Sequence, residues 1–337
     1  MHNFLEKPIQ LLNSNFELIP ETIDYLKLFS DKQISIISII GPKSSGKSFL
    51  SNQLIGKFNN GFEIGSMENI TESCTKGIWF WGKPLIKNDI YIFILDSEGL
   101  NSETNLKNSQ KIFTLINLIS SLVIYNYKKD DDTDENTIIS DEVIKRSNEL
   151  FQKLISYLKN VKLQKDDSIN EKENELNEVN IPLYYWLYRD YSIKEMTTYF
   201  ENTSNFFAEN EFFLKLFKNK IQEVSLPSPM DENEMLVNVY LDEEDDGKGG
   251  PFEDDYKKSF DEFKNNIIEK IEPKIINDNI LNGGNLCKVL NIYTKNLREE
   301  QTIFLSDNSK KNEEQINNFF IETEEKYKKI LILKIKK

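Results

Sequence analysis

The chain has 337 residues, enough for one large domain or two small ones with a substantial core. Its 56 acidic and 42 basic residues give a formal net charge of -14, which argues against nucleic acid or an anionic membrane as the main partner. Hydrophobic residues make up 39% of the chain, too many for a disordered protein. The composition therefore predicts a folded globular protein in which any bound anion is held by local groups.

Scarce residue types exclude whole chemistries. The only histidine is His2, and the only cysteines are Cys74 and Cys287. A catalytic triad would have to use the second residue of the chain, and a zinc site of His and Cys ligands cannot be assembled. Two cysteines far apart in sequence are typical of free thiols in a reducing compartment. No apolar run has the length of a signal peptide or a membrane span, so we expect a cytoplasmic protein without a transmembrane segment.

Short apolar runs alternate with helical patterns along the chain. The runs that predict strands occupy residues 34–40, 91–95, 121–127 and 183–188, with a further strand-like run at 236–241. Helical spacing of apolar residues predicts helices near residues 49–58, 112–119 and 256–271, and a loop plus helix at 275–297. The charged stretches 128–136 and 163–180 are expected to be solvated insertions. Strands alternating with helices predict an α/β fold with a largely parallel central sheet flanked by helices.

The strongest motif follows the first predicted strand. Residues 41–48, GPKSSGKS, match the pattern G-x-x-x-x-G-K-[ST] between a buried strand and a helix, which is the context of a P-loop. Backbone N–H groups of such a loop and the N-terminus of the helix bind phosphates, the lysine reaches the β- and γ-phosphates, and the final serine ligates Mg²⁺. The residues predicted to bind the nucleotide here are Lys43, Ser44, Ser45, Gly46, Lys47, Ser48 and Phe49.

Two further stretches are placed to act on the γ-phosphate. Asp96 ends the second predicted strand, where a carboxylate can hold the water shell of Mg²⁺, and Gly99 can turn its N–H toward the γ-phosphate. On the polar loop before residue 79, Thr75 is placed to bring a hydroxyl to Mg²⁺ and γ-phosphate, and Ser73 to orient a water. The predicted metal ligands are therefore Ser48, Thr75 and Asp96, and the predicted catalytic residues are Lys47, Ser73, Thr75 and Gly99. The neighbouring Trp79 and Trp81 are expected to pack in a strand.

These motifs, in this order, resemble the guanylate-binding protein and atlastin family of large GTPases, and most of all the guanylate-binding proteins. The matching stretches are GPKSSGKSFL, ESCTKGIWFW, LDSEGL, IFTLINLISSLVIYNY and LYYWLYRD, within roughly residues 8–297. The resemblance implies a GTPase domain in residues 1–297 and a C-terminal helical segment in residues 298–337. It also implies GTP and GDP as ligands, Mg²⁺ as cofactor and a homodimer across the nucleotide face.

The same resemblance assigns guanine recognition to Arg189 and Asp190 at the end of a strand. An aspartate carboxylate can accept hydrogen bonds from both N1–H and the exocyclic N2 amine of guanine, which adenine cannot return.

One position departs from the family pattern. Many members carry an arginine at the fourth P-loop position, where this chain has Ser44, and the adjacent Lys43 lacks a planar fork. Besides Arg189 the chain has only Arg146 and Arg298, which lie in no motif. An arginine finger contributes ~10³ to 10⁵ in rate, so we expect slow hydrolysis.

Three functions remain open. These are GTP hydrolysis, a nucleotide-regulated binding module with negligible hydrolysis, and a P-loop small-molecule phosphotransferase, which the scarcity of arginines disfavours.

Overall fold

The computed structural model describes residues 4–57, 60–64, 75–100, 106–128, 181–189, 220–229, 252–276 and 279–299. The elements in chain order are β1 (Pro8–Leu12), α1 (Pro20–Lys27), β2 (Gln33–Ile40), α2 (Lys47–Ile55), β3 (Ile78–Trp81), β4 (Leu85–Lys87), β5 (Ile90–Ser97), α3 (Leu106–Ile119), β6 (Leu122–Lys128), β7 (Leu183–Arg189), β8 (Ile221–Leu226), α8 (Asp254–Lys270), β9 (Ile275–Ile276), β10 (Asn279–Ile280) and α9 (Gly283–Arg298).

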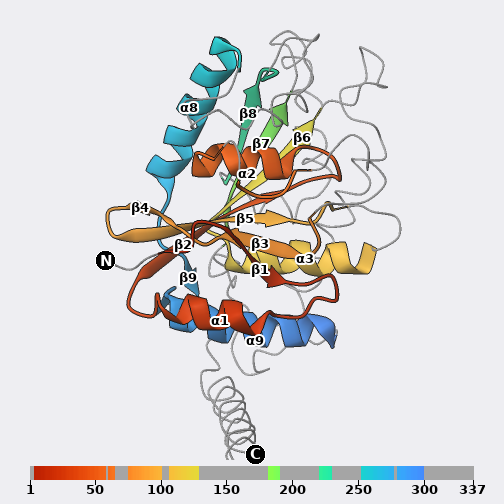
Figure 1. The fold of residues 1–337 in the computed structure, drawn as a ribbon, viewed down its shortest axis with the longest axis vertical. Helices are drawn as coiled ribbons and strands as arrows, with labels where there is room; N and C mark the ends of the chain where they lie inside the picture. Colours follow the sequence, from red (N-terminus) through yellow and green to blue (C-terminus); the bar gives the residue numbers. More distant parts are fainter. Residues whose placement is uncertain are drawn as a thin grey trace, which may run out of the picture.

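A central sheet of eight strands organises the described part of the chain (Figure 1). Its order is β1-β3-β5-β2-β6-β7-β8, with β4 paired to β5 outside this path. Strands β5, β2, β6, β7 and β8 are parallel to one another, whereas β1, β3 and β4 join by antiparallel pairing. The fold is therefore an α/β fold with a largely parallel sheet, as the sequence predicts.

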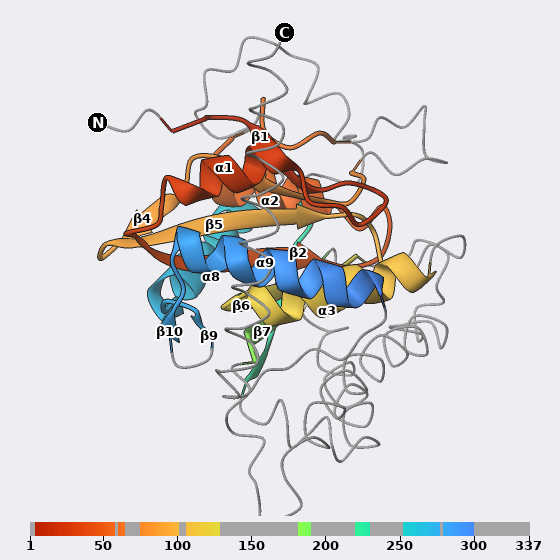
Figure 2. The same cartoon turned by 90° about the horizontal axis from the view of Figure 1, so that it is seen from below.

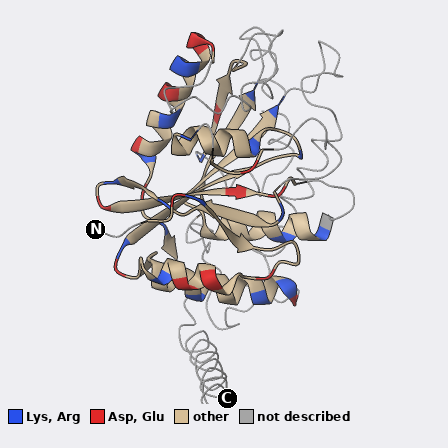
Figure 3. Ribbon diagram, viewed as in Figure 1, with Lys and Arg blue, Asp and Glu red and all other residues tan. Residues whose placement is uncertain are grey.

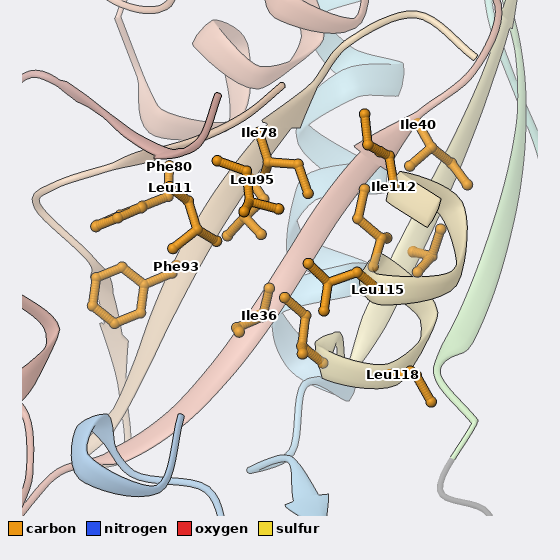
Figure 4. Close-up of a cluster of buried hydrophobic side chains, with 14 of the residues drawn as sticks. Leu11, Ile36, Ile40, Ile78, Phe80, Phe93, Leu95, Ile112, Leu115 and Leu118 are labelled. Atoms are coloured by element: carbon orange, nitrogen blue, oxygen red, sulfur yellow. The ribbon is translucent and has the colours of Figure 1, made fainter. Parts of the chain in front are cut away.

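Helices cover both faces of this sheet. The alternation along β2 divides the core, because Ile34 and Ile36 pack on one side while Ile37 and Ile39 pack on the other. Helices α2 and α8 cover the side of Ile37, and α1, α3 and α9 cover the side of Ile36, as the two views show (Figures 1 and 2). Figure 4 shows side chains of α3 packing with those of β2, β3 and β5 on the side of Ile36.

The two helices on the α2 side of the sheet differ in how much of their surface is buried. The segment Lys47–Ile55 has one charged residue, which is buried, whereas α8 carries both signs of charge along its length (Figure 3). Helix α8 buries only one stripe, formed by Tyr256, Phe260, Phe263 and Ile267. The charged side of α8 therefore faces water.

The four main predicted strands are confirmed, and so are the predicted helices near 49–58, 112–119 and 256–271 and the helix within 275–297, with ends shifted by a few residues. Trp79 and Trp81 lie in β3, as expected. Helix α1 and strands β1, β4, β8, β9 and β10 were not predicted. The strand-like run at 236–241 lies outside the described residues, as do 129–136 and 163–180 of the charged stretches. Nowhere in the described ranges is a helix both long and apolar enough to cross a bilayer.

Candidate nucleotide-binding site

The predicted P-loop connects the central strand β2 to helix α2, at the carboxyl ends of the parallel strands. Gly41 has φ 149°, and a Cβ on it would lie 2.2 Å from the main-chain oxygen of Asn126. Gly46 has φ 80° and caps the N-terminus of α2. Both positions therefore require glycine, one for the close approach of β6 and one for the left-handed turn that starts the helix.

Lys47 is the first residue of α2 and is buried, although it is a lysine. Its Nζ donates a hydrogen bond to the carbonyl oxygen of Pro42 at 2.8 Å, within the same loop. Burial lowers the pKa of Lys47 to about 8, and the negative charges of Asp96 and Glu98 only partly oppose this. The site thus places a poorly solvated ammonium group beside the P-loop backbone, where an added anion would stabilise its charge.

Three oxygen-bearing side chains converge next to this lysine, from three separate segments. Asp96, the second-last residue of β5, is fully buried, and its Oδ2 accepts hydrogen bonds from Ser48 Oγ at 2.7 Å and Thr75 Oγ1 at 3.1 Å. The two hydroxyl oxygens are themselves 3.1 Å apart. Burial raises the pKa of Asp96, and hydrogen bonds from the two hydroxyls and the charge of Lys47 oppose the rise.

Hard oxygen ligands of this kind are what Mg²⁺ prefers in proteins. One hydroxyl comes from the P-loop helix, the other from the loop before β3, and the carboxylate from the end of β5. Both hydroxyls donate to the same carboxylate oxygen. The residues present therefore fit the predicted metal site in donor type and in position.

The segment after Asp96 joins the P-loop to the loop that carries Thr75. Glu98 binds Gly77 twice, since its N–H donates to the Gly77 oxygen at 2.8 Å and its Oε2 accepts from the Gly77 N–H at 3.0 Å. Leu100 N–H donates to the Gly41 oxygen at 3.0 Å. A Cβ on Gly99 would lie 2.7 Å from Lys43 Cα, so only glycine allows this contact. The predicted γ-phosphate elements therefore form one hydrogen-bonded strip.

Arg189 ends β7 and lies against the P-loop, with 2% of its surface exposed. Its guanidinium group donates to the Gly46 oxygen at 3.4 Å and sits 5.2 Å from the centre of the Phe49 ring. Its Nε has no hydrogen-bond partner among the described residues. Phe49 in turn packs edge-on against Phe252 before α8, so its side chain belongs to the core.

Asn126 is a site residue that the sequence analysis did not single out. It lies on β6 with no exposed surface, and its Nδ2 donates to the carbonyl oxygen of Ser45 at 2.6 Å. Its Oδ1 has no hydrogen-bond partner in the described parts of the chain. The available signal was a polar residue inside a run of buried apolar ones, SLVIYNY, because such groups are retained only where they are bonded.

The structure places the predicted site residues as follows. Lys47, Ser48, Thr75 and Asp96 lie together, Gly99 packs on Lys43, and Ser45 and Gly46 lie in the same loop. Ser44 is exposed on the outside of the loop with φ 60°. Ser73 and Asp190 lie outside the described residues, so their roles stay predictions from the sequence.

A loop of this sequence between a central strand and a helix, with an aspartate ending the adjacent strand, defines a P-loop nucleotide-binding protein. The sequence also matches the family Guanylate-binding protein, N-terminal domain, over residues 13–229, and the chain belongs to this family of GTPase domains. The match confirms the resemblance drawn from the motifs. Because it ends at residue 229, the predicted domain boundary at 297 stays a prediction.

Individual relatives are similar over shorter stretches. Guanylate-binding protein 3 of Homo sapiens is 39% identical over 119 residues, which cover 34% of this chain and 19% of that protein. Guanylate-binding protein 5 of Mus musculus is 29% identical over 216 residues, covering 63% of this chain and 34% of the relative. The chain therefore matches about a fifth to a third of the length of these curated relatives.

Among solved structures, a bacterial selenocysteine-specific elongation factor aligns with a TM-score of 0.36 and 13% identity, over 72% of this chain and 30% of that one. A likeness of this size supports no inference about the chain.

Proposed function

We propose that this chain binds GTP together with Mg²⁺ and hydrolyses it. The observation that carries the proposal is the convergence of Ser48, Thr75 and Asp96 beside the buried Lys47, in a chain of the guanylate-binding protein family. A metal ligated by the two hydroxyls, with Asp96 holding its water shell, would neutralise charge on the phosphates.

The residues act on the phosphates mainly by charge and position. The Lys47 ammonium exchanges the Pro42 carbonyl for phosphate oxygens, which carry negative charge and therefore form a stronger hydrogen bond. The N-terminus of α2 adds a partial positive charge at the same place. Gly99 packs on Lys43, and its N–H is assigned the predicted γ-phosphate contact. Ser73 retains its predicted role in orienting the attacking water.

Recognition of guanine is assigned to Asp190, the residue after Arg189. The hydrogen bond from Arg189 to Gly46 supports this assignment, because it fixes the end of β7 against the P-loop at the start of α2. Arg189 itself acts on the loop rather than on the base in this account.

The exposed Ser44 favours a second candidate function, a nucleotide-regulated binding module with negligible hydrolysis. A serine at this position brings no positive charge to the transferring phosphoryl group, and the one arginine described near the loop, Arg189, is engaged with Gly46 and Phe49. Ser44→Arg is expected to raise the rate of phosphate release by at least about tenfold. Ser44→Lys is the matched control, since it adds charge without the planar fork. An unchanged rate in Ser44→Arg would show that the stabilising charge comes from elsewhere.

Binding and turnover measurements test the proposal. We expect calorimetric titration to show tight binding of GTP and GDP, much weaker binding of ATP, and a loss of GTP affinity when Mg²⁺ is chelated. Phosphate release from GTP then separates the hydrolase from the binding module. Equal affinity for ATP and GTP would overturn the assignment of guanine specificity.

Self-association belongs to the same proposal. Family membership supports a homodimer across the nucleotide face, and the exposed position of Ser44 leaves that side of the loop accessible. Dimer formation with GTP would make specific activity rise with protein concentration, which phosphate release over a dilution series measures. A cytoplasmic location remains the expectation from the two cysteines, which lie far apart in the sequence.

A further inference from the structure

Two consecutive carbonyl groups of the P-loop accept hydrogen bonds from side chains of two neighbouring strands. Asn126 on β6 donates to the Ser45 oxygen at 2.6 Å. Arg189 on β7 donates to the Gly46 oxygen at 3.4 Å, and the same oxygen also accepts from Leu50 N–H within α2 at 3.0 Å. The two strands are paired directly, with Asn126 opposite Leu187. The loop is therefore attached to the rigid centre of the sheet through its carbonyl groups.

Peptide geometry gives this attachment a direction. In a trans peptide the C=O and the following N–H point in opposite directions, and no cis peptide occurs in the described residues. Holding the Ser45 oxygen toward β6 points the N–H group of Gly46 away from that strand. This N–H is one of the donors that a P-loop directs at phosphates.

Asn126 itself is placed with little freedom. Its side chain is completely buried, and its main-chain oxygen fills the space where a Cβ of Gly41 would lie, at 2.2 Å. Its Oδ1 has no partner within the described ranges, and leaving a buried amide oxygen unpaired costs stability. An apolar residue at this point of β6 would avoid that cost, so the hydrogen bond to Ser45 is the contact that accounts for an asparagine here.

We propose that Asn126 is a positioning residue for the phosphates of the bound nucleotide. It acts through the loop, by fixing the Ser45 peptide so that the Gly46 N–H keeps the direction needed for a phosphate oxygen. The inference rests on the proposed binding of guanine nucleotides, and it assigns to Asn126 the phosphate part of the affinity only. The base and ribose are bound by other residues.

The test compares a ligand with phosphates to one without. GDP and guanosine share the base and ribose, so their dissociation constants are measured for the parent, Asn126→Ala and Asn126→Asp by calorimetry and ligand-observed NMR. We expect both variants to bind GDP about tenfold more weakly, because a hydrogen bond that orders the loop is lost, and guanosine within about twofold of the parent. Asn126→Asp retains the shape of the side chain and replaces the donor by an acceptor, so its result is free of a cavity.

Asn117 offers a matched control. It is also a buried asparagine, on α3, and its amide donates to the Phe113 oxygen at 2.8 Å and accepts from the Tyr184 hydroxyl, far from the loop. Asn117→Ala should lower the unfolding midpoint while leaving the affinity for GDP within about twofold. Unfolding midpoints of all variants are measured without ligand, and binding is measured well below them.

Three outcomes are distinguishable. If Asn126→Ala loses GDP and guanosine affinity equally, or no more GDP affinity than Asn117→Ala does, the residue is merely structural and the inference is overturned. A selective loss for GDP supports it. If the parent binds neither GDP nor GTP, the proposed function fails first, before any variant is compared.

Discussion

The two sides of the candidate site satisfy their polar groups in different ways. On the side of β5, the hydroxyls of Ser48 and Thr75 and the carboxylate of Asp96 hydrogen-bond one another. On the side of β6 and β7, Asn126 and Arg189 donate to P-loop carbonyls, while Asn126 Oδ1 and Arg189 Nε lack partners among the described residues. The polar side chains on the first side hydrogen-bond one another. Those on the second side support the loop, and each keeps a polar atom without a described partner.

This difference suggests that one side of the site serves hydrolysis and the other positions the P-loop. Groups that bond one another can exchange those bonds for a metal and phosphate at small cost, because few polar atoms are left unpaired at any stage. Groups that bond the backbone hold the loop whichever nucleotide is present. We therefore expect changes on the β5 side to alter hydrolysis, and changes on the β6 and β7 side to alter affinity.

Lys47 stands between the two sides, so its removal should have the largest effect. Lys47→Ala deletes the buried ammonium that is assigned to the phosphates, and affinity for GTP and GDP should fall by more than about 100-fold. Calorimetric titration measures the loss. Lys57→Ala is the control, since that lysine lies just beyond α2 in an exposed ion pair with Glu6. Retained GTP affinity in Lys47→Ala would show that the loop does not bind phosphate.

Thr75→Ala tests the β5 side. The hydroxyl is assigned contacts that form only with metal and γ-phosphate, so GDP affinity should stay within about twofold while phosphate release falls about 100-fold. Thr75→Ser retains the hydroxyl and should restore most of the rate. An equal loss of GDP and GTP affinity would place Thr75 in a structural role and remove the distinction between the two sides.

Asp190→Asn tests base recognition beyond β7. Losing one charge-assisted pair costs about 2 to 3 kcal/mol, so GTP affinity should fall roughly 30- to 150-fold. Xanthine nucleotides should bind better than they do to the parent, because their extra carbonyl accepts from the new amide. Competition titrations with GTP and XTP give both constants. GTP binding as tight as in the parent would exclude Asp190 from the base site.

The smallest effect is expected far from both sides, at Lys274. Burial, with the nearby Lys220 as a smaller cause, lowers the pKa of Lys274 to about 7. The unfolded chain therefore carries a proton there that the folded chain loses as pH rises above 7, and the free energy of unfolding should increase with pH by at most about 1.4 kcal/mol per unit.

Urea unfolding between pH 7 and 8 measures this slope. Lys47, with a pKa of about 8, adds to it mainly at higher pH. Lys274→Met should flatten the slope in this window, whereas the exposed Lys258→Met should not. A slope that persists in Lys274→Met would assign the titration to another group.

Central strands and motif residues could be predicted because their signals are local. The runs that form β2, β5, β6 and β7 are almost wholly buried, so they read as continuous apolar stretches. Strands β1 and β8 lie at the two ends of the sheet and are largely half-buried, with polar residues among the apolar ones. They therefore lack the pattern on which the prediction depended.

The same limit applies within the site. Lys47, Ser48, Thr75 and Asp96 belong to motifs whose spacing carries their chemistry. The hydrogen bond from Asn126 to Ser45 joins residues 81 positions apart, so the local sequence pattern does not predict it. The double bond of Glu98 to Gly77 likewise depends on how two loops meet.

The packing of α9 beside α1 has a consequence for biosynthesis. Cys287 donates to the Ile23 oxygen across 264 residues, and Ser35 donates to the Glu272 oxygen across 237 residues. A ribosome adding about 5 to 20 residues per second needs on the order of 10 to 50 s to make the second partner after the first. During that interval the apolar stripe of α1, which includes Tyr25 and Leu26, has no cover from α9. Closure of this layer is therefore a late event in the life of the nascent chain.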